Sequence, residues 1–130
     1  MPHSFSLRVY YEDTDLAGIV YYANYMKFIE RARSEWVREI GVDQVALKAE
    51  AGIVFAVRRL EADYLAPAKF DDMLDVVTEV KDISAARITL TQDVMRGNDV
   101  LFKSVVTLVC LGETGRPSRL PADIRQLMQR

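Results

Sequence analysis

The stretch YYEDTDLAGIVYYANY spans residues 10–25 and decides the fold. Its first half is acidic, Gly18 follows, and an apolar, aromatic run then leads into a segment with helical periodicity. Carboxylates as close in sequence as Asp13 and Asp15 raise each other's pKa when both lose water, so packing alone does not favour them here. A helix N-terminus offers unpaired N–H groups and a partial positive charge. The stretch therefore predicts an active site in which a carboxylate acts as nucleophile or base and helix N–H groups hold a developing oxyanion.

The segments before and after the Gly18 region differ in the spacing of their apolar residues. Residues 5–11 alternate as a strand does, with Phe5, Leu7 and Val9 on one face. Residues 22–40 carry apolar side chains at spacings of three and four, which predicts a long amphipathic helix that Gly41 ends.

The rest of the chain predicts a short helix and four more strands. Asp43 is placed to cap a helix that runs to residue 51. Strands are expected at 53–65, with Leu60, Ala62 and Tyr64 facing inward, and at 73–81, 86–95 and 100–111; a short helix follows Pro121. One strand, a long helix and four strands joined mostly by hairpins indicate an α+β fold with an antiparallel sheet packed on one helix.

The chain resembles the 4-hydroxybenzoyl-CoA thioesterase family in three runs: YEDTD at 11–15, GIVYY at 18–22 and NY at 24–25. Within that family it is most similar to the bacterial acyl-CoA thioesterases associated with the Tol–Pal system. The resemblance covers nearly the whole chain. It implies a single hotdog domain over residues 1–130, in which an antiparallel five-stranded sheet wraps around one long central helix.

The resemblance also implies an activity: hydrolysis of an acyl-CoA thioester to the free acid and CoA, without a cofactor. Asp15 matches the family's catalytic acid and is the expected nucleophile or general base, whereas Asp13 is expected to orient the loop. The residues expected to form the oxyanion hole or position the substrate are Gly18, Tyr21, Tyr22 and Ala23. Judged by composition alone, Asp15 is equally well explained as a loop acid that caps the helix or binds solvent. Gly18 is better explained as a residue that permits a tight turn than as one that touches the substrate.

Tyr22 is a departure from the Tol–Pal-associated branch, in which many members carry histidine at this position. A tyrosine is a poor base near neutral pH, although its hydroxyl can donate a hydrogen bond. The effect of Tyr22 on rate and acyl preference is left open, as is the choice between aromatic and aliphatic acyl groups.

CoA carries phosphate groups that need cationic or N–H partners. The candidates by resemblance are Arg58, Arg59, Lys81, Ser84 and Arg87, although each taken singly is better explained as an ordinary surface residue. Because the family's site lies between subunits, a homodimer or homotetramer is expected.

Composition excludes several other classes of protein. The 130 residues are 50% hydrophobic and 28% charged with a net charge of -2, which fits one globular domain and not a general nucleic-acid binder. The single histidine, His3, is expected to be a solvated terminal residue, so a histidine-based triad or metal site is not expected. The single Cys110 is expected to be a core residue, and the absence of a secretory signal or transmembrane segment predicts a cytoplasmic location.

Three alternatives accompany the acyl-CoA thioesterase hypothesis. The same chemistry on acyl carrier protein would need a basic docking face, for which Arg31, Arg33 and Arg38 are candidates. A non-catalytic module that binds acyl thioesters or acts as a scaffold would gain little from the charge of Asp15. A hotdog dehydratase would need a histidine in the core, which this sequence lacks.

Overall fold

The structure is a computed structural model and describes residues 2–129. Its five strands are β1 (His3–Arg8), β2 (Val54–Tyr64), β3 (Met73–Ile83), β4 (Arg87–Arg96) and β5 (Asp99–Leu111). They form one antiparallel sheet in the order β1-β3-β4-β5-β2, so β1 and β2 are the edge strands. The predicted α+β fold with a five-stranded antiparallel sheet is confirmed.

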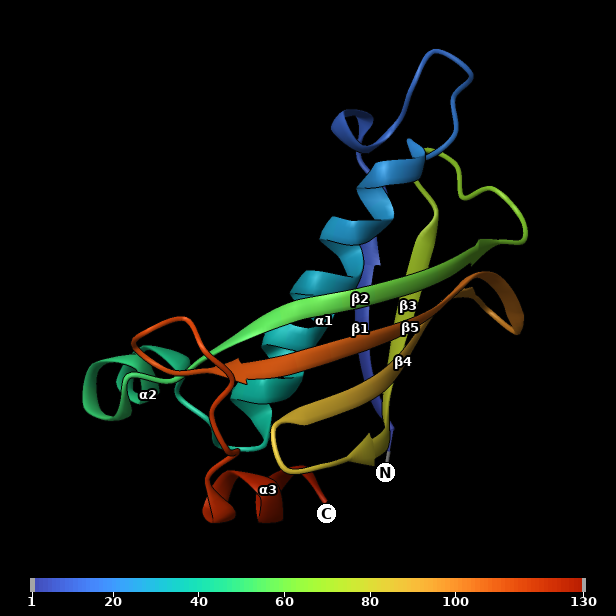
Figure 1. Cartoon of the computed structure of the whole chain (residues 1–130). Helices are drawn as coiled ribbons and strands as arrows, with labels where there is room; N and C mark the ends of the chain where they lie inside the picture. The colour runs from blue at the N-terminus through green and yellow to red at the C-terminus, as the bar shows by residue number, and fades with distance from the viewer. Residues whose placement is uncertain (1, 130) are drawn as a thin grey trace.

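The long helix α1 (Tyr25–Glu39) lies against the concave face of this sheet (Figure 1). Its buried side chains recur at the predicted spacings: Tyr25, Phe28, Ile29, Ala32, Trp36 and Val37. They pack on alternate residues of the central strands, such as Leu90 of β4 and Val106 of β5, which are fully buried. The amphipathic stripe of the sequence is therefore the core of the domain.

Two shorter helices flank this core. Helix α2 (Gln44–Ala51) is capped as predicted, because the Asp43 carboxylate accepts the Ala46 N–H at 3.0 Å and Gly52 follows the helix at φ +66°. Helix α3 (Ala122–Met128) covers the end of the sheet near the β3–β4 hairpin, where the Arg125 side chain donates to the Ser84 carbonyl at 2.5 Å. No helix among residues 2–129 is long and apolar enough to cross a bilayer.

The structure corrects two predicted boundaries at the motif. The first strand ends at Arg8 and not at residue 11, because the Asp13 carboxylate accepts the Tyr10 N–H at 2.8 Å and turns residues 11–13 into a 3₁₀ turn. The long helix begins at Tyr25 and not at residue 22, since residues 22–24 form a second 3₁₀ turn closed by the Asn24 N–H on the Tyr21 carbonyl.

Two burial expectations also need correction. His3 is not a solvated terminal residue: its side chain is 12% exposed and its Nε2 lies 2.6 Å from a Glu39 carboxylate oxygen. Leu60 and Tyr64 lie on the inner face of β2, opposite the buried Val106 and Phe102, but remain 37% and 47% exposed. The sequence pattern assigned the face correctly but did not indicate that β2 is an edge strand.

The two ends of the sheet carry different parts of the chain (Figure 1). The loop that follows β1, the start of α1 and the β2–β3 connection gather at one end. The β3–β4 hairpin and α3 lie at the other. The motif of residues 10–25 is thus concentrated at a single end of the domain.

Candidate active site

Asp15 begins a tight turn at this end of the sheet. Its carbonyl accepts the Gly18 N–H at 3.0 Å and its N–H donates to the Ile19 carbonyl at 3.0 Å, while Thr14 and Val20 form a β-bridge. One carboxylate oxygen of Asp15 accepts the Ala17 N–H at 3.0 Å, as aspartate often does at the first position of a turn. The side chain is exposed and does not cap a helix in the part of the chain that the structure describes. The capping part of the alternative explanation is therefore wrong, whereas an exposed Asp15 still fits a loop acid that binds solvent as well as it fits a catalytic carboxylate.

Gly18 has φ +79°, in the left-handed region that L side chains rarely adopt. A Cβ built on Gly18 would meet no atom within 4 Å, so backbone conformation, and not lack of space, requires glycine here. Within the single chain, this supports the reading of Gly18 as a turn residue.

Asp13 is a buried residue whose hydrogen bonds stabilise the loop. It is 5% exposed, and its two carboxylate oxygens accept the Tyr10 N–H and the Asn24 side-chain amide, each at 2.8 Å. Its carbonyl accepts the Tyr21 N–H at 2.9 Å. Asp13 therefore orients the loop through hydrogen bonds, as predicted, and is not available for catalysis.

The turn before α1 presents free N–H groups. The N–H groups of Tyr21 and Asn24 are taken by the carbonyls of Asp13 and Tyr21. Across residues 2–129, the N–H groups of Tyr22 and Ala23 have no hydrogen-bond acceptor, and neither this turn nor α1 has a side-chain cap. Of the predicted oxyanion donors, Tyr22 and Ala23 remain open, whereas the Tyr21 N–H is engaged.

Aromatic side chains surround the turn. The rings of Tyr21 and Tyr22 lie 4.9 Å apart, and Tyr22 contacts Tyr64 edge-on at 6.3 Å. A hydrogen bond and charge repulsion from the Tyr22 hydroxyl raise the pKa of Tyr21, and desolvation and the charge of Asp15 contribute less in the same direction. Tyr21 therefore remains a neutral phenol near neutral pH, with its hydroxyl engaged by that of Tyr22.

Comparisons with known proteins show what this chain is similar to. Residues 17–103 match the family model described as the thioesterase superfamily. The chain is 42% identical over 124 residues to the acyl-CoA thioesterase YbgC of Haemophilus influenzae, which covers 94% of this chain and 90% of that protein. It is 41% identical over 120 residues to the acyl-CoA thioester hydrolase YbgC of Escherichia coli O157:H7, covering 91% and 89% of the two chains.

The chain belongs to the thioesterase superfamily. Solved structures show the same hotdog fold. A probable thioesterase from Bartonella henselae superposes with a TM-score of 0.89 at 35% identity, covering 93% of this chain and all of that one. A mutant of 4-hydroxybenzoyl-CoA thioesterase in complex with 4-hydroxybenzoyl-CoA superposes with a TM-score of 0.90 at 23% identity, over 98% of both chains.

The thioesterase does not bring all predicted CoA-binding residues to Asp15. Lys81, Ser84 and Arg87 lie around the β3–β4 hairpin, at the opposite end of the sheet from Asp15 (Figure 1). Arg58 and Arg59 lie along the edge strand β2, where Arg59 forms an ion pair with Glu61 at 2.5 Å. Within one chain, the hairpin residues are therefore separated from the Asp15 site.

The predicted docking face for a carrier protein offers fewer available arginines in the structure than in the sequence. Arg33 points inward and donates to the Gln92 side chain at 2.9 Å, and burial lowers the pKa of its guanidinium group. Arg38 pairs with Glu35 on the same helix. The predicted basic face thus loses two of its three cations to partners within the chain.

Sequence reasoning missed two groups that shape the site. The Tyr64 hydroxyl donates to the Tyr22 carbonyl at 2.8 Å, although the sequence pattern marked Tyr64 only as an inward-facing strand residue. Ala68 is fully buried in the β2–β3 connection. Its backbone forms hydrogen bonds with Val20, in the hairpin of residues 14–20 that carries Asp15 (the Asp15 hairpin), and with Tyr25 at the start of α1. No local sequence signal marks either contact, because each joins segments more than 40 residues apart.

Proposed function

We propose that this thioesterase hydrolyses acyl-CoA to the free acid and CoA, with Asp15 as the reacting carboxylate. The observation that supports this most directly is that an exposed Asp15 and the uncapped turn with the free N–H groups of Tyr22 and Ala23 belong to one hydrogen-bonded loop, closed by the Thr14–Val20 bridge. The acyl-CoA substrate is that of relatives at 41–42% identity over most of the chain. The reaction needs water and no cofactor.

Two routes use the same groups. In the nucleophilic route, an Asp15 oxygen attacks the thioester carbonyl carbon, the C–S bond breaks, CoA leaves as thiolate, and water hydrolyses the resulting mixed anhydride. In the general-base route, Asp15 takes a proton from a water molecule that attacks the carbonyl carbon, and CoA again leaves as thiolate. In either route, negative charge develops on the carbonyl oxygen, and the N–H groups of Tyr22 and Ala23 are the proposed donors to it.

The proposed active enzyme is at least a dimer that forms through β2. This edge strand has 11 residues, and an unpaired edge of that length is a template for another strand. Its exposed apolar side chains include Val57 at 50% and Leu60 at 37% exposure. If the β2 strands of two copies pair antiparallel with Leu60 at the centre, Arg59 lies opposite the partner's Glu61. The charges of the strand are therefore self-complementary.

That pairing would also complete the site. Tyr64, which contacts the Tyr22 turn, would lie opposite the beginning of the partner's β2, so each Asp15 site would lie beside the seam between two chains. A site between chains accounts for the exposure of Asp15 in one chain.

We also propose a cytoplasmic location, which is consistent with the single, buried Cys110 and its lack of a disulfide partner.

The test is thiol release from short, long and aromatic acyl-CoA esters by the wild type and by Asp15→Asn. The substitution keeps the size of the side chain but removes its charge. We expect turnover by the wild type and a loss of at least about a hundredfold in Asp15→Asn, which corresponds to about 2.7 kcal/mol of transition-state stabilisation. Equal, slow rates in both proteins, together with binding of CoA esters, would overturn the proposal in favour of a non-catalytic binding module. Parallel assays with matched acyl carrier protein esters distinguish the two carriers.

A further inference from the structure

The β2–β3 connection, residues 65–72, supports both halves of the candidate site. The Ala68 carbonyl accepts the Val20 N–H at 2.8 Å, and Ile19 and Lys69 form a β-bridge, so the arm of the hairpin that follows Asp15 is paired to this connection. The Ala68 N–H donates to the Tyr25 hydroxyl at 3.1 Å, which ties the same peptide segment to the first residue of α1. Ala68 thus sets the Asp15 hairpin relative to the helix start.

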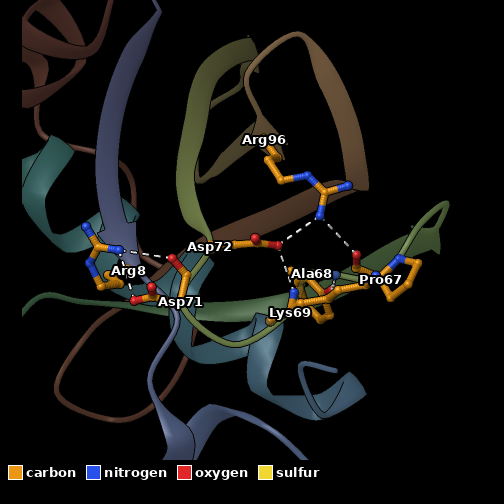
Figure 2. Close-up of polar contacts among 8 residues, drawn as sticks. Arg8, Pro67, Ala68, Lys69, Asp71, Asp72 and Arg96 are labelled. Carbon is orange, nitrogen blue, oxygen red and sulfur yellow. Dashed lines mark hydrogen bonds and ion pairs between the residues drawn. The ribbon is translucent and has the colours of Figure 1, made fainter. Parts of the chain in front are cut away.

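An ion pair holds the backbone on both sides of Ala68 (Figure 2). One Asp72 carboxylate oxygen accepts the Lys69 N–H at 2.9 Å and the Arg96 guanidinium at 2.8 Å. The same Arg96 nitrogen lies 3.5 Å from the Pro67 carbonyl oxygen. Arg96 comes from the end of β4, so the pair anchors the connection to the central sheet.

The carboxylate of Asp72 is held in its charged form. Burial on its own raises the pKa of Asp72, but the Lys69 N–H and the Arg96 guanidinium together outweigh this and bring the pKa below its usual value. The pair is partly shielded, with side-chain exposures of 38% for Arg96 and 23% for Asp72. A charged, bifurcated contact of this kind is stronger than a neutral hydrogen bond.

We propose that Arg96 and Asp72 are positioning residues for the thioesterase reaction, and that they act through Ala68 on the hairpin that carries Asp15. This inference rests on the proposed function of Asp15. Neither residue reaches the Asp15 carboxylate through a contact of its own. They instead set the position of that carboxylate relative to the N–H groups of the Tyr22 turn. Small errors in the position of a reacting group lower the catalytic rate strongly.

The chain provides a matched control on the same turn. Arg8 donates to the Asp71 carbonyl and carboxylate, each at 3.0 Å, and this ion pair is 48% and 66% exposed (Figure 2). It contains the same residue types one position away, but neither side chain forms a hydrogen bond or ion pair with residues 67–69. An effect of Arg96 that Arg8 does not share therefore reports on the Ala68 connection and not on surface charge.

The experiment compares Arg96→Gln, Arg96→Lys and Arg8→Gln by steady-state kinetics and by amide hydrogen exchange. We expect Arg96→Gln to lower kcat by about tenfold or more while KM changes less, because the substrate still binds to a misplaced Asp15. Arg96→Lys should recover part of the rate, since it restores the charge opposite Asp72, and Arg8→Gln should match the wild type. Exchange in the peptide that covers residues 14–21 should be faster in Arg96→Gln alone.

Two results would overturn the inference. The first is wild-type kcat and wild-type exchange at residues 14–21 in Arg96→Gln. The second is exchange that is faster throughout β4 and β5, with a large fall in Tm, because the pair would then stabilise the whole fold and not the hairpin. If the wild type shows no turnover, the proposed function fails, and the exchange measurement alone still decides whether the ion pair orders the hairpin.

Discussion

The Tyr64 hydroxyl donates a hydrogen bond of 2.8 Å to the carbonyl oxygen of Tyr22, and this bond joins the edge strand to the turn before α1. The Tyr22 carbonyl and the Ala23 N–H belong to one planar trans peptide, so they point in opposite directions. By fixing the carbonyl, Tyr64 fixes the direction of an N–H group that we assign to the oxyanion.

Tyr64→Phe tests this relationship. The ring stays in place against Phe102 and Tyr25, but the hydroxyl is lost. We expect a stability loss of only about 1 kcal/mol, typical of one hydrogen bond, together with a several-fold lower kcat and a nearly unchanged KM. Denaturant titration and steady-state kinetics measure the two effects. An unchanged kcat would show that Tyr64 does not position the turn.

Gly18→Ala separates a turn residue from a residue that contacts substrate. Because the φ of Gly18 is +79° and no atom lies near its Cβ position, the alanine is strained by about 1–2 kcal/mol without a steric clash. We expect a lower Tm and a lower kcat. Gly18→Asn should lose less stability, since asparagine tolerates this conformation better. If Gly18→Ala keeps the wild-type Tm while its KM rises sharply, Gly18 contacts the substrate directly.

The charges on β2 predict a compensating pair of substitutions. Arg59→Glu alone should weaken association of the two chains, because it would set two carboxylates opposite each other across the proposed seam. Glu61→Arg alone should also weaken association, because it would set two arginines opposite each other. The double variant should restore association. Sedimentation velocity at several protein concentrations measures this. If both single variants keep the wild-type assembly, pairing about Leu60 is wrong.

The stability of the fold should depend on pH through Asp72. Its pKa is lower in the folded protein than in the unfolded chain, so its contribution is complete above the unfolded pKa of about 3.9 and is lost as pH falls through the folded value. Asp72→Asn should therefore flatten the decline of stability below about pH 4. Thermal unfolding from pH 2 to 7 measures this, with Asp71→Asn as the matched control. Equal declines in wild type and Asp72→Asn would contradict the assignment.

Cys110 should be unreactive in the folded enzyme. It is fully buried, and burial raises the pKa of its thiol to about 11, while thiol reagents attack the thiolate. We expect no reaction with a disulfide reagent at pH 8 until the protein unfolds, so the reaction rate also reports unfolding. Rapid modification of the native protein, or loss of activity on Cys110→Ser without loss of stability, would show a functional thiol.

The sequence by itself determined the fold class and the family, and it supplied Asp15 as the candidate site residue. The helical stripe from Tyr25 to Trp36 and the alternation in the strands fixed which residues form the core, because burial of apolar faces depends on local period. The chemistry of carboxylates and helix N-termini indicated a reacting carboxylate in the motif, and the family resemblance selected Asp15 as the candidate. Asp43 and Gly52 likewise marked the ends of α2 through local capping.

Only the tertiary structure decided how the site is held. The contacts of Tyr64 with Tyr22, of Ala68 with Val20, and of Arg96 with Asp72 join segments that are far apart in the sequence. Strand order decided that β2 is an edge and that Lys81, Ser84 and Arg87 lie away from Asp15. Such relationships depend on how the sheet is assembled, and no local period or turn signal encodes them, which is why the sequence marked Asp15 as a candidate but not the contacts that surround it.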